Sequence, residues 1–140
     1  MLLPFVGCSL LLPMTHVEAV AEPRAPSLLQ LLASPAQFEG RRVLVRGFCH
    51  FGFEEHAVYL YREDSDRMNS DNGLWLETDE ERSDLNETFV NVAGFFTARN
   101  HGHLGAWRGA IEHITRLERA PSRAEIERSI QPIPRPSGTP

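Results

Sequence analysis

The chain has no lysine, so all 14 of its lysine or arginine residues are arginines. Its 19 acidic residues outnumber them, and the formal net charge is -5. Nucleic-acid-binding proteins neutralise phosphates with clustered basic side chains, and this composition does not favour that class. The sequence also lacks a Gly-x-Ser-x-Gly nucleophile elbow, a phosphate-binding P-loop and a dinucleotide fingerprint. The sequence therefore names no reaction and predicts no cofactor.

Cysteine is almost absent, with Cys8 and Cys49 the two in the chain. If an N-terminal leader is removed, a single thiol remains, and it cannot form an internal disulfide. The fold must then be held together by its apolar core. Cys49 shares a predicted strand face with Val45, Phe51 and Phe53, and we expect this face to point into the core, which favours a small buried side chain at Cys49. A reactive thiol is the alternative, and no Cys-x-x-Cys pair supports it.

Residues 1–14 form the longest apolar run of the chain, and Ala19-Val20-Ala21 follows with the small-x-small pattern of a signal peptidase site. We therefore predict a signal peptide over residues 1–21 and a periplasmic or secreted protein, with a cytoplasmic protein as the alternative. The run is shorter than the roughly 20 residues that span a bilayer, so we predict no membrane span. Cys8 loosely resembles a lipidation site, but the apolar run continues beyond it, which argues against a lipid anchor.

Residues 22–26 form a short linker, and residues 27–119 carry the pattern of a single mainly β domain. Ser27 can cap a short leucine-rich helix, which Pro35 ends. Alternation of apolar and polar residues then predicts five strands, over residues 42–54, 57–62, 73–77, 88–98 and 107–117, with a polar loop over 63–72 between the second and the third. Gly47 and Gly94, each in the middle of a long strand, suit a strongly curved sheet.

The fifth strand is the ambiguous one, because its apolar residues fit a helical period nearly as well as a bulged strand. Gly109 and the β-branched residues Ile111 and Ile114 favour the strand. Residues 120–140 are predicted to contain a short helix over 122–130 and a disordered tail over 131–140, which holds four prolines.

The segment Gly40-Arg41-Arg42-Val43-Leu44-Val45-Arg46-Gly47 resembles the first strand of an OB-fold, a small Greek-key barrel. Five later motifs resemble a group of small bacterial proteins with OB-like domains, over residues 28–117 in all: Phe53-Glu54, Tyr59-Leu60, Leu74-Trp75-Leu76, Val90-Asn91-Val92-Ala93-Gly94 and Gly102-His103-x-Gly105. The resemblance implies a five-stranded OB-like barrel with an N-terminal helix, and no established activity. Many OB-folds place a helix between strands three and four, where this chain has the short acidic segment 78–87. We expect the N-terminal helix to seal the barrel instead.

Four aromatic residues and two arginines fall on strand faces opposite the predicted core, and they make a candidate ligand-binding platform. An exposed surface of this kind on an OB-like barrel can stack a base, a sugar or a partner's side chain. The alternative is that the helix, the C-terminal segment or neighbouring strands cover these rings. The candidates are Phe48, Tyr59, Tyr61, Trp75, Arg46 and Arg62.

His101 and His103 lie two residues apart in a predicted loop, where they could share a metal ion with a third ligand from His50, His56 or His113. The alternative is that they bond to the backbone and shape the turn. The sequence therefore predicts a non-enzymatic binding or interaction module with an unknown protein or a small ligand as its partner. The alternatives are an oligonucleotide-binding protein and a metal-dependent hydrolase centred on the two loop histidines.

Overall fold

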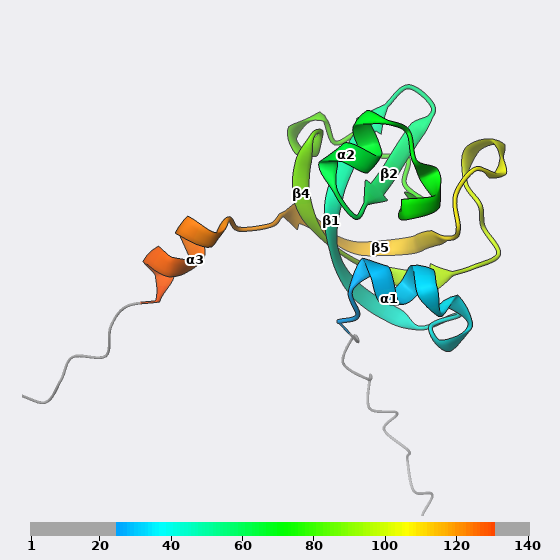
Figure 1. Cartoon of the computed structure of the whole chain (residues 1–140), viewed down its shortest axis with the longest axis horizontal. Coiled ribbons are helices and arrows are strands. Elements are labelled where there is room, and N and C mark those ends of the chain that lie inside the picture. The colour runs from blue at the N-terminus through cyan, green and yellow to red at the C-terminus, as the bar shows by residue number, and fades with distance from the viewer. Residues whose placement is uncertain (1–24, 131–140) are drawn as a thin grey trace, which may run out of the picture.

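Five strands close into a barrel in the computed structural model, which describes residues 25–130 (Figure 1). Their order around the barrel is β1-β2-β3-β5-β4, and all neighbours are antiparallel except the parallel pair β3 and β5. The prediction of a mainly β domain with five strands is confirmed. The strands are β1 (Arg42–Gly52), β2 (Glu55–Tyr59), β3 (Gly73–Leu76), β4 (Thr88–Thr97) and β5 (Ala110–Arg119). The signal peptide predicted over 1–21 and the tail predicted over 131–140 lie outside the described residues.

The core of the barrel follows the alternation of the two long strands. Val43 and Val45 of β1 lie opposite Gly94 and Val92 of β4, and the three valines are buried. Burying such side chains is worth roughly 1.5–3 kcal/mol each relative to leaving them in water, so this row supplies a large part of the stability. Residues of all five strands complete one cluster, which includes Cys49, Phe51, Val58, Leu74, Leu76, Val90, Phe96 and Ile111.

Helix α1 (Leu28–Ala33) closes the barrel as expected, because its side chains enter the same core cluster. The Ser27 side chain accepts a hydrogen bond from the backbone N–H of Gln30, and the Gln30 side chain accepts one from the backbone N–H of Ser27. This capping box satisfies two donors that the start of a helix leaves free. Leu28 and Leu31 point into the barrel and are buried. Between β3 and β4 the chain forms only the 3-10 turn Ser83–Leu85.

A bulge explains why the fifth strand resembled a helix in sequence. The pairing of β4 with β5 shifts register between Ala93 and Phe95, and His113 on β5 has a left-handed φ of 46°. The bulge inserts extra residues, so Ile111 and Ile114, three apart, both contact the core. Gly94 sits at this point because a side chain there would meet the Glu112 carbonyl oxygen at 2.6 Å. The prediction of a strand is confirmed.

Several predicted strand ends differ from the structure by one to three residues, and two of these differences change the chain near the β1–β2 turn and after β2. Strand β1 ends at Gly52 rather than Glu54, because Glu54 turns left-handed (φ 59°) and the hairpin closes there. Phe53, assigned to the core face, is therefore an exposed turn residue. The segment 63–72, expected as a loop, begins with helix α2 (Arg62–Asp66), and β2 ends three residues early to reach it. Acidic residues in the first turn of α2 suit the positive end of the helix dipole.

Helix α3 (Arg123–Ser129) confirms the predicted C-terminal helix and begins with a second capping box, between Ser122 and Glu125. It projects away from the barrel and buries none of its residues (Figure 1). Arg46 donates a hydrogen bond to the carbonyl oxygen of Pro121 at 2.6 Å, which ties the chain to β1 just before the helix. Within residues 25–130, no helix combines the length and the apolar character needed to cross a membrane.

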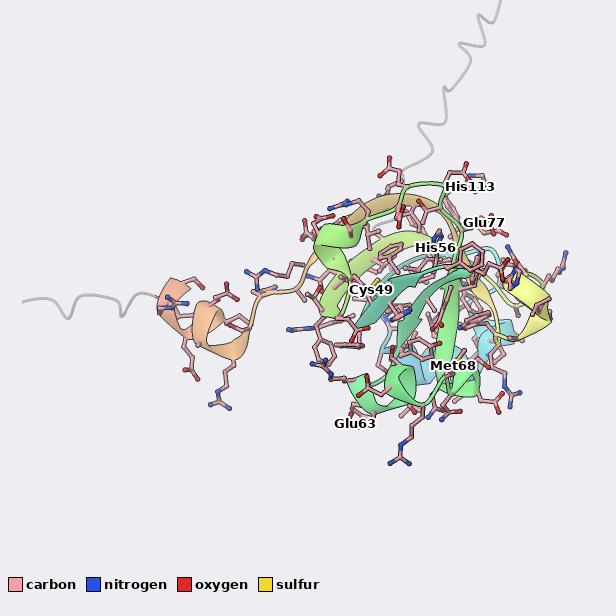
Figure 2. The ribbon with its side chains drawn as sticks, turned by 90° about the horizontal axis from the view of Figure 1, so that it is seen from above. Cys49, His56, Glu63, Met68, Glu77 and His113 are labelled. Atoms are coloured by element: carbon pink, nitrogen blue, oxygen red, sulfur yellow. The ribbon has the colours of Figure 1, made fainter. Side chains whose placement is uncertain are left out.

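Cys49 is fully buried in the core, as predicted (Figure 2). Burial raises the pKa of its thiol to about 12; the Arg82 guanidinium opposes the rise, and the Glu87 carboxylate adds to it. In the unfolded chain the thiol ionises near pH 9. The folded state therefore keeps the proton at pH values where the unfolded state has lost it.

We expect the free energy of unfolding to be at its full value below about pH 9 and to fall as the pH rises from about 9 to about 12. The slope from one such thiol approaches about 1.4 kcal/mol per pH unit. Urea titrations at a series of pH values would measure the slope, with Cys49→Ala as the comparison. An equal slope in Cys49→Ala would show that the thiol is not its source.

Candidate functional site

The predicted aromatic platform is not an exposed surface. Phe48 is 3% exposed and Tyr59 is 1% exposed, so the prediction that they face solvent is wrong. The Phe89 ring packs edge-on against the Phe48 ring, with the two ring centroids 5.5 Å apart. The Arg62 guanidinium lies 5.5 Å from the centroid of the Phe48 ring. Trp107, from the connection before β5, packs over Tyr59. Segments distant in sequence therefore cover both rings, as the alternative interpretation held.

The remaining platform candidates do not form a single surface. Trp75 stacks on His56 with a ring-centroid separation of 5.7 Å. It also packs at a tilt against Trp107, with the ring centroids 5.1 Å apart. Tyr61 is exposed and shares a groove of about 560 Å³ with Arg46, next to helix α1. The structure therefore does not bring the six candidates together at one site, and the groove beside Tyr61 and Arg46 holds two of them.

The two loop histidines have different partners. His101 Nδ1 lies 2.7 Å from the carbonyl oxygen of Trp107, a contact that closes the loop on itself. His103 Nε2 lies 3.3 Å from a carboxylate oxygen of Glu54 on the β1–β2 turn. Across residues 25–130, no group of three His, Cys, Asp or Glu side chains is arranged to hold a metal ion. The turn-shaping interpretation accounts for His101, and the metal role has no observation in its favour.

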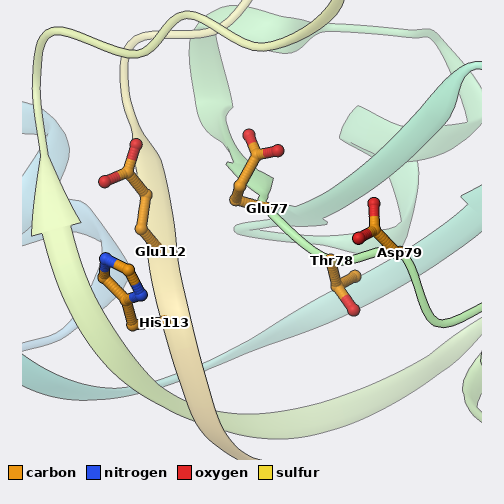
Figure 3. Close-up of a pocket in the computed structure, with 5 residues that line it drawn as sticks. All are labelled: Glu77, Thr78, Asp79, Glu112 and His113. Atoms are coloured by element: carbon orange, nitrogen blue, oxygen red, sulfur yellow. The ribbon is translucent and has the colours of Figure 1, made fainter.

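The β4–β5 loop is held by two carboxylates, Glu77 directly after β3 and Glu112 on β5. The amide of Asn100 donates to Glu77 and to Glu112, both at 2.9 Å, and thereby ties the loop to the ends of β3 and β5. Figure 3 shows these two carboxylates beside Thr78, Asp79 and His113, around a pocket of about 250 Å³. The Asn100 amide bonds one oxygen of each carboxylate, so both carboxylates contribute to anchoring the loop.

Gly102 positions the same loop against the barrel. Its backbone has φ 63° and ψ -159°, a region that essentially only glycine adopts. A side chain here would also meet the Trp75 ring at 2.6 Å. The loop can therefore lie flat on Trp75 only with glycine at this position. This is a physical reason for the first glycine of the Gly-His-x-Gly motif.

A second cavity of about 250 Å³ lies where the β1–β2 turn, the segment after α2 and the β4–β5 loop meet; we call it the loop cavity. Phe53 (94% exposed), Leu104 (89%) and Met68 (74%) line it, and they are the three most exposed large apolar side chains of residues 25–130. Its full lining is Phe53, Glu54, Glu55, Met68, His103, Leu104, Ala106 and Trp107.

Backbone strain gathers at the loop cavity. Residues 25–130 contain five non-glycine residues with left-handed φ, and three of them line the cavity: Glu54 (59°), Met68 (52°) and Leu104 (56°). Each such residue costs of order 1–3 kcal/mol, and such strain clusters at binding and active sites. The turns are therefore held in costly conformations that present these side chains at the cavity.

The floor of the loop cavity is polar and largely buried. The Glu55 side chain is 13% exposed, and it accepts a hydrogen bond from the Tyr59 hydroxyl at 2.6 Å. Burial raises the pKa of Tyr59, and the bond to Glu55 raises it further. The Trp107 indole N–H lies close enough to lower the pKa of Tyr59, although it makes no hydrogen bond of good geometry within residues 25–130.

The apolar residues of this site were not predicted from the sequence. Phe53 was assigned to the core, and Met68 and Leu104 belong to segments that were treated as polar loops. A signal does exist, because each is a large apolar side chain isolated among polar or glycine residues, where a core role is not available.

Comparison with protein-family models, with curated proteins and with solved structures finds no match for this chain.

Proposed function

We propose that this chain is an exported, non-enzymatic interaction module with an OB-like barrel, which binds a segment of a protein partner at the loop cavity. The closed strand order β1-β2-β3-β5-β4, with its parallel β3–β5 pair, supports the OB-like assignment. OB-folds bind their ligands over strands two and three and the loops 1–2 and 4–5. The loop cavity lies between the corresponding two connections of this barrel.

One observation carries the proposed binding role: the most exposed apolar side chains gather around one cavity instead of being scattered. Single exposed apolar residues are ordinary, whereas a group of them around a hollow marks an interaction site. Phe53, Met68 and Leu104 provide this apolar rim. The carboxylates of Glu54 and Glu55 would repel phosphates, so the site favours a protein segment over an oligonucleotide.

A selection from a random peptide library on the purified protein tests the role. We expect selected peptides to bind at least about tenfold more weakly to Leu104→Asp, because a charge replaces an apolar contact at the rim. Leu29→Asp is the matched control, since Leu29 is also exposed (59%) but lies on α1, outside the cavity. Equal loss in both variants, or no enrichment of peptides, would contradict the proposal, as would salt-sensitive binding of single-stranded oligothymidine that Leu104→Asp leaves unchanged.

Export is proposed from the apolar run and the Ala19-Val20-Ala21 pattern alone. We expect the protein recovered from the periplasm or medium of a bacterial host to begin at Glu22. Mass spectrometry of the intact protein would measure this. Recovery of a chain that starts at Met1 in the cytosolic fraction would contradict it.

A further inference from the structure

We infer that the loop cavity selects a cationic side chain, the guanidinium or ammonium group of an Arg or Lys residue in the partner segment. This inference rests on the proposed function and adds the chemical class of the group that enters the cavity. Three features of the lining carry it: its balance of charge, the burial of one carboxylate and the aromatic wall.

The charge of the lining is negative. Its eight residues include the carboxylates Glu54 and Glu55 and the imidazole of His103, with no arginine. The negative electrostatic potential extends below the cavity to the Tyr59 hydroxyl. Burial is the main cause of the raised pKa of Tyr59, and the carboxylates of Glu55 and Asp64 raise it further. A cation that enters the cavity therefore gains attraction, and an anion meets repulsion.

Glu55 is the group that gains most from a bound cation. Its side chain is largely buried, its hydrogen bond comes from the neutral hydroxyl of Tyr59, and the nearest basic group is His50 Nε2 at 3.9 Å. A carboxylate removed from water loses solvation that a single neutral donor only partly replaces. A guanidinium or ammonium group supplies charge-assisted hydrogen bonds, which are about twice as strong as neutral ones.

The rest of the lining suits the apolar parts of such a side chain. Trp107 and Phe53 supply aromatic rings, and aromatic faces attract cations, tryptophan most strongly. Met68, Leu104 and Ala106 offer apolar contact to the methylene stem that carries the charge. Glu54 lies at the more exposed rim and already contacts His103 at 3.3 Å, so its contribution should be smaller than that of Glu55.

Five synthetic peptides of the form Gly-Leu-X-Leu-Gly, with X as Arg, Lys, citrulline, norleucine or Glu, test the selectivity by fluorescence anisotropy on the purified full chain. We expect the Arg and Lys peptides to bind about tenfold more tightly than the citrulline and norleucine peptides, the factor that one charge-assisted bond supplies. Glu55→Gln should abolish this preference without weakening the norleucine peptide, because glutamine still accepts the Tyr59 hydrogen bond. Glu63→Gln, an exposed carboxylate of α2 outside the lining, should leave it intact (Figure 2).

The outcomes separate the two proposals. If all five peptides bind equally and all weaken in Leu104→Asp, the interaction module stands and the cation selectivity is wrong. If Glu55→Gln keeps the wild-type preference, another group sets it and the inference is overturned. If no peptide binds, or if binding ignores Leu104→Asp, the loop cavity is not the binding site and both proposals fall. Thermal melting of each variant shows that the barrel is folded in every comparison.

Discussion

Replacing Leu31 by alanine is expected to lower the free energy of unfolding by about 3 kcal/mol, within the range of about 2–5 kcal/mol measured for buried leucines. Leu31 is completely buried and belongs to the core cluster of the barrel. Alanine removes apolar contacts and leaves a hole that the closed sheet cannot fill by collapsing. Urea unfolding followed by circular dichroism would measure the loss. For a domain of this size it is a large part of the total stability.

The control for this prediction lies two residues away on the same helix. Leu29 faces solvent, so Leu29→Ala keeps the helix propensity comparable and should change stability by no more than about 0.5 kcal/mol. Similar losses in the two variants would mean that the helix acts through its own stability rather than by sealing the barrel. A small loss in both would show that α1 detaches readily and that the barrel stands without it.

Helix α1 also shows how the same packing problem can be solved from a different place in the chain. A closed barrel leaves an apolar end, which a helix must cover. Between β3 and β4 this chain has a 3-10 turn with the single buried residue Leu85, so the covering helix comes before β1. The sequence allowed this prediction, because a capped leucine-rich segment stood before the first strand while the acidic segment 78–87 could bury little.

The strands were predictable because alternation reports one buried face, and Val43, Val45, Val90 and Val92 are all inside the barrel. Predicted strand ends were wrong where the local backbone conformation, rather than the side-chain pattern, sets the end of the strand. The side chain of Glu54 gives no indication of a left-handed backbone, so the predicted strand ran two residues beyond the end of β1. The bulge in β5 likewise removed the alternation that would have distinguished a strand from a helix.

The outer face of the sheet was harder to predict than its inner face. Phe48 and Tyr59 alternate with core residues, and in a sheet with one solvent-exposed face such residues point to solvent. Tertiary contacts then cover them: Phe89 and Arg62 over Phe48, Trp107 over Tyr59. Covering residues come from other segments, so a pattern read along one strand does not reveal them. The loop cavity was missed for the same reason, since three separate connections build it.

Replacing Gly102 by alanine is expected to displace the β4–β5 loop while the barrel stays folded. The added side chain would need a backbone conformation that costs of order 1–3 kcal/mol, and it would press on the Trp75 ring at 2.6 Å. The loop must lift, which breaks the bond from the Gly102 N–H to Asn100 and moves His103 and Leu104 away from the cavity. We expect peptide binding to fall by at least about tenfold and tryptophan fluorescence to change, because Trp75 loses its cover.

Gly105→Ala is the control that separates the steric clash with Trp75 from the energetic cost of a left-handed backbone. Gly105 also has a left-handed φ of 68°, but an added side chain there meets no atom within 4 Å. Its substitution should cost only the left-handed conformation, about 1–2 kcal/mol, and leave the Trp75 signal unchanged. Identical fluorescence and peptide affinity in the two variants would show that contact with Trp75 does not position the loop. A change confined to Gly102→Ala, with the far-ultraviolet circular dichroism of the barrel preserved, ties the shape of the loop cavity to the packing of one glycine on one tryptophan.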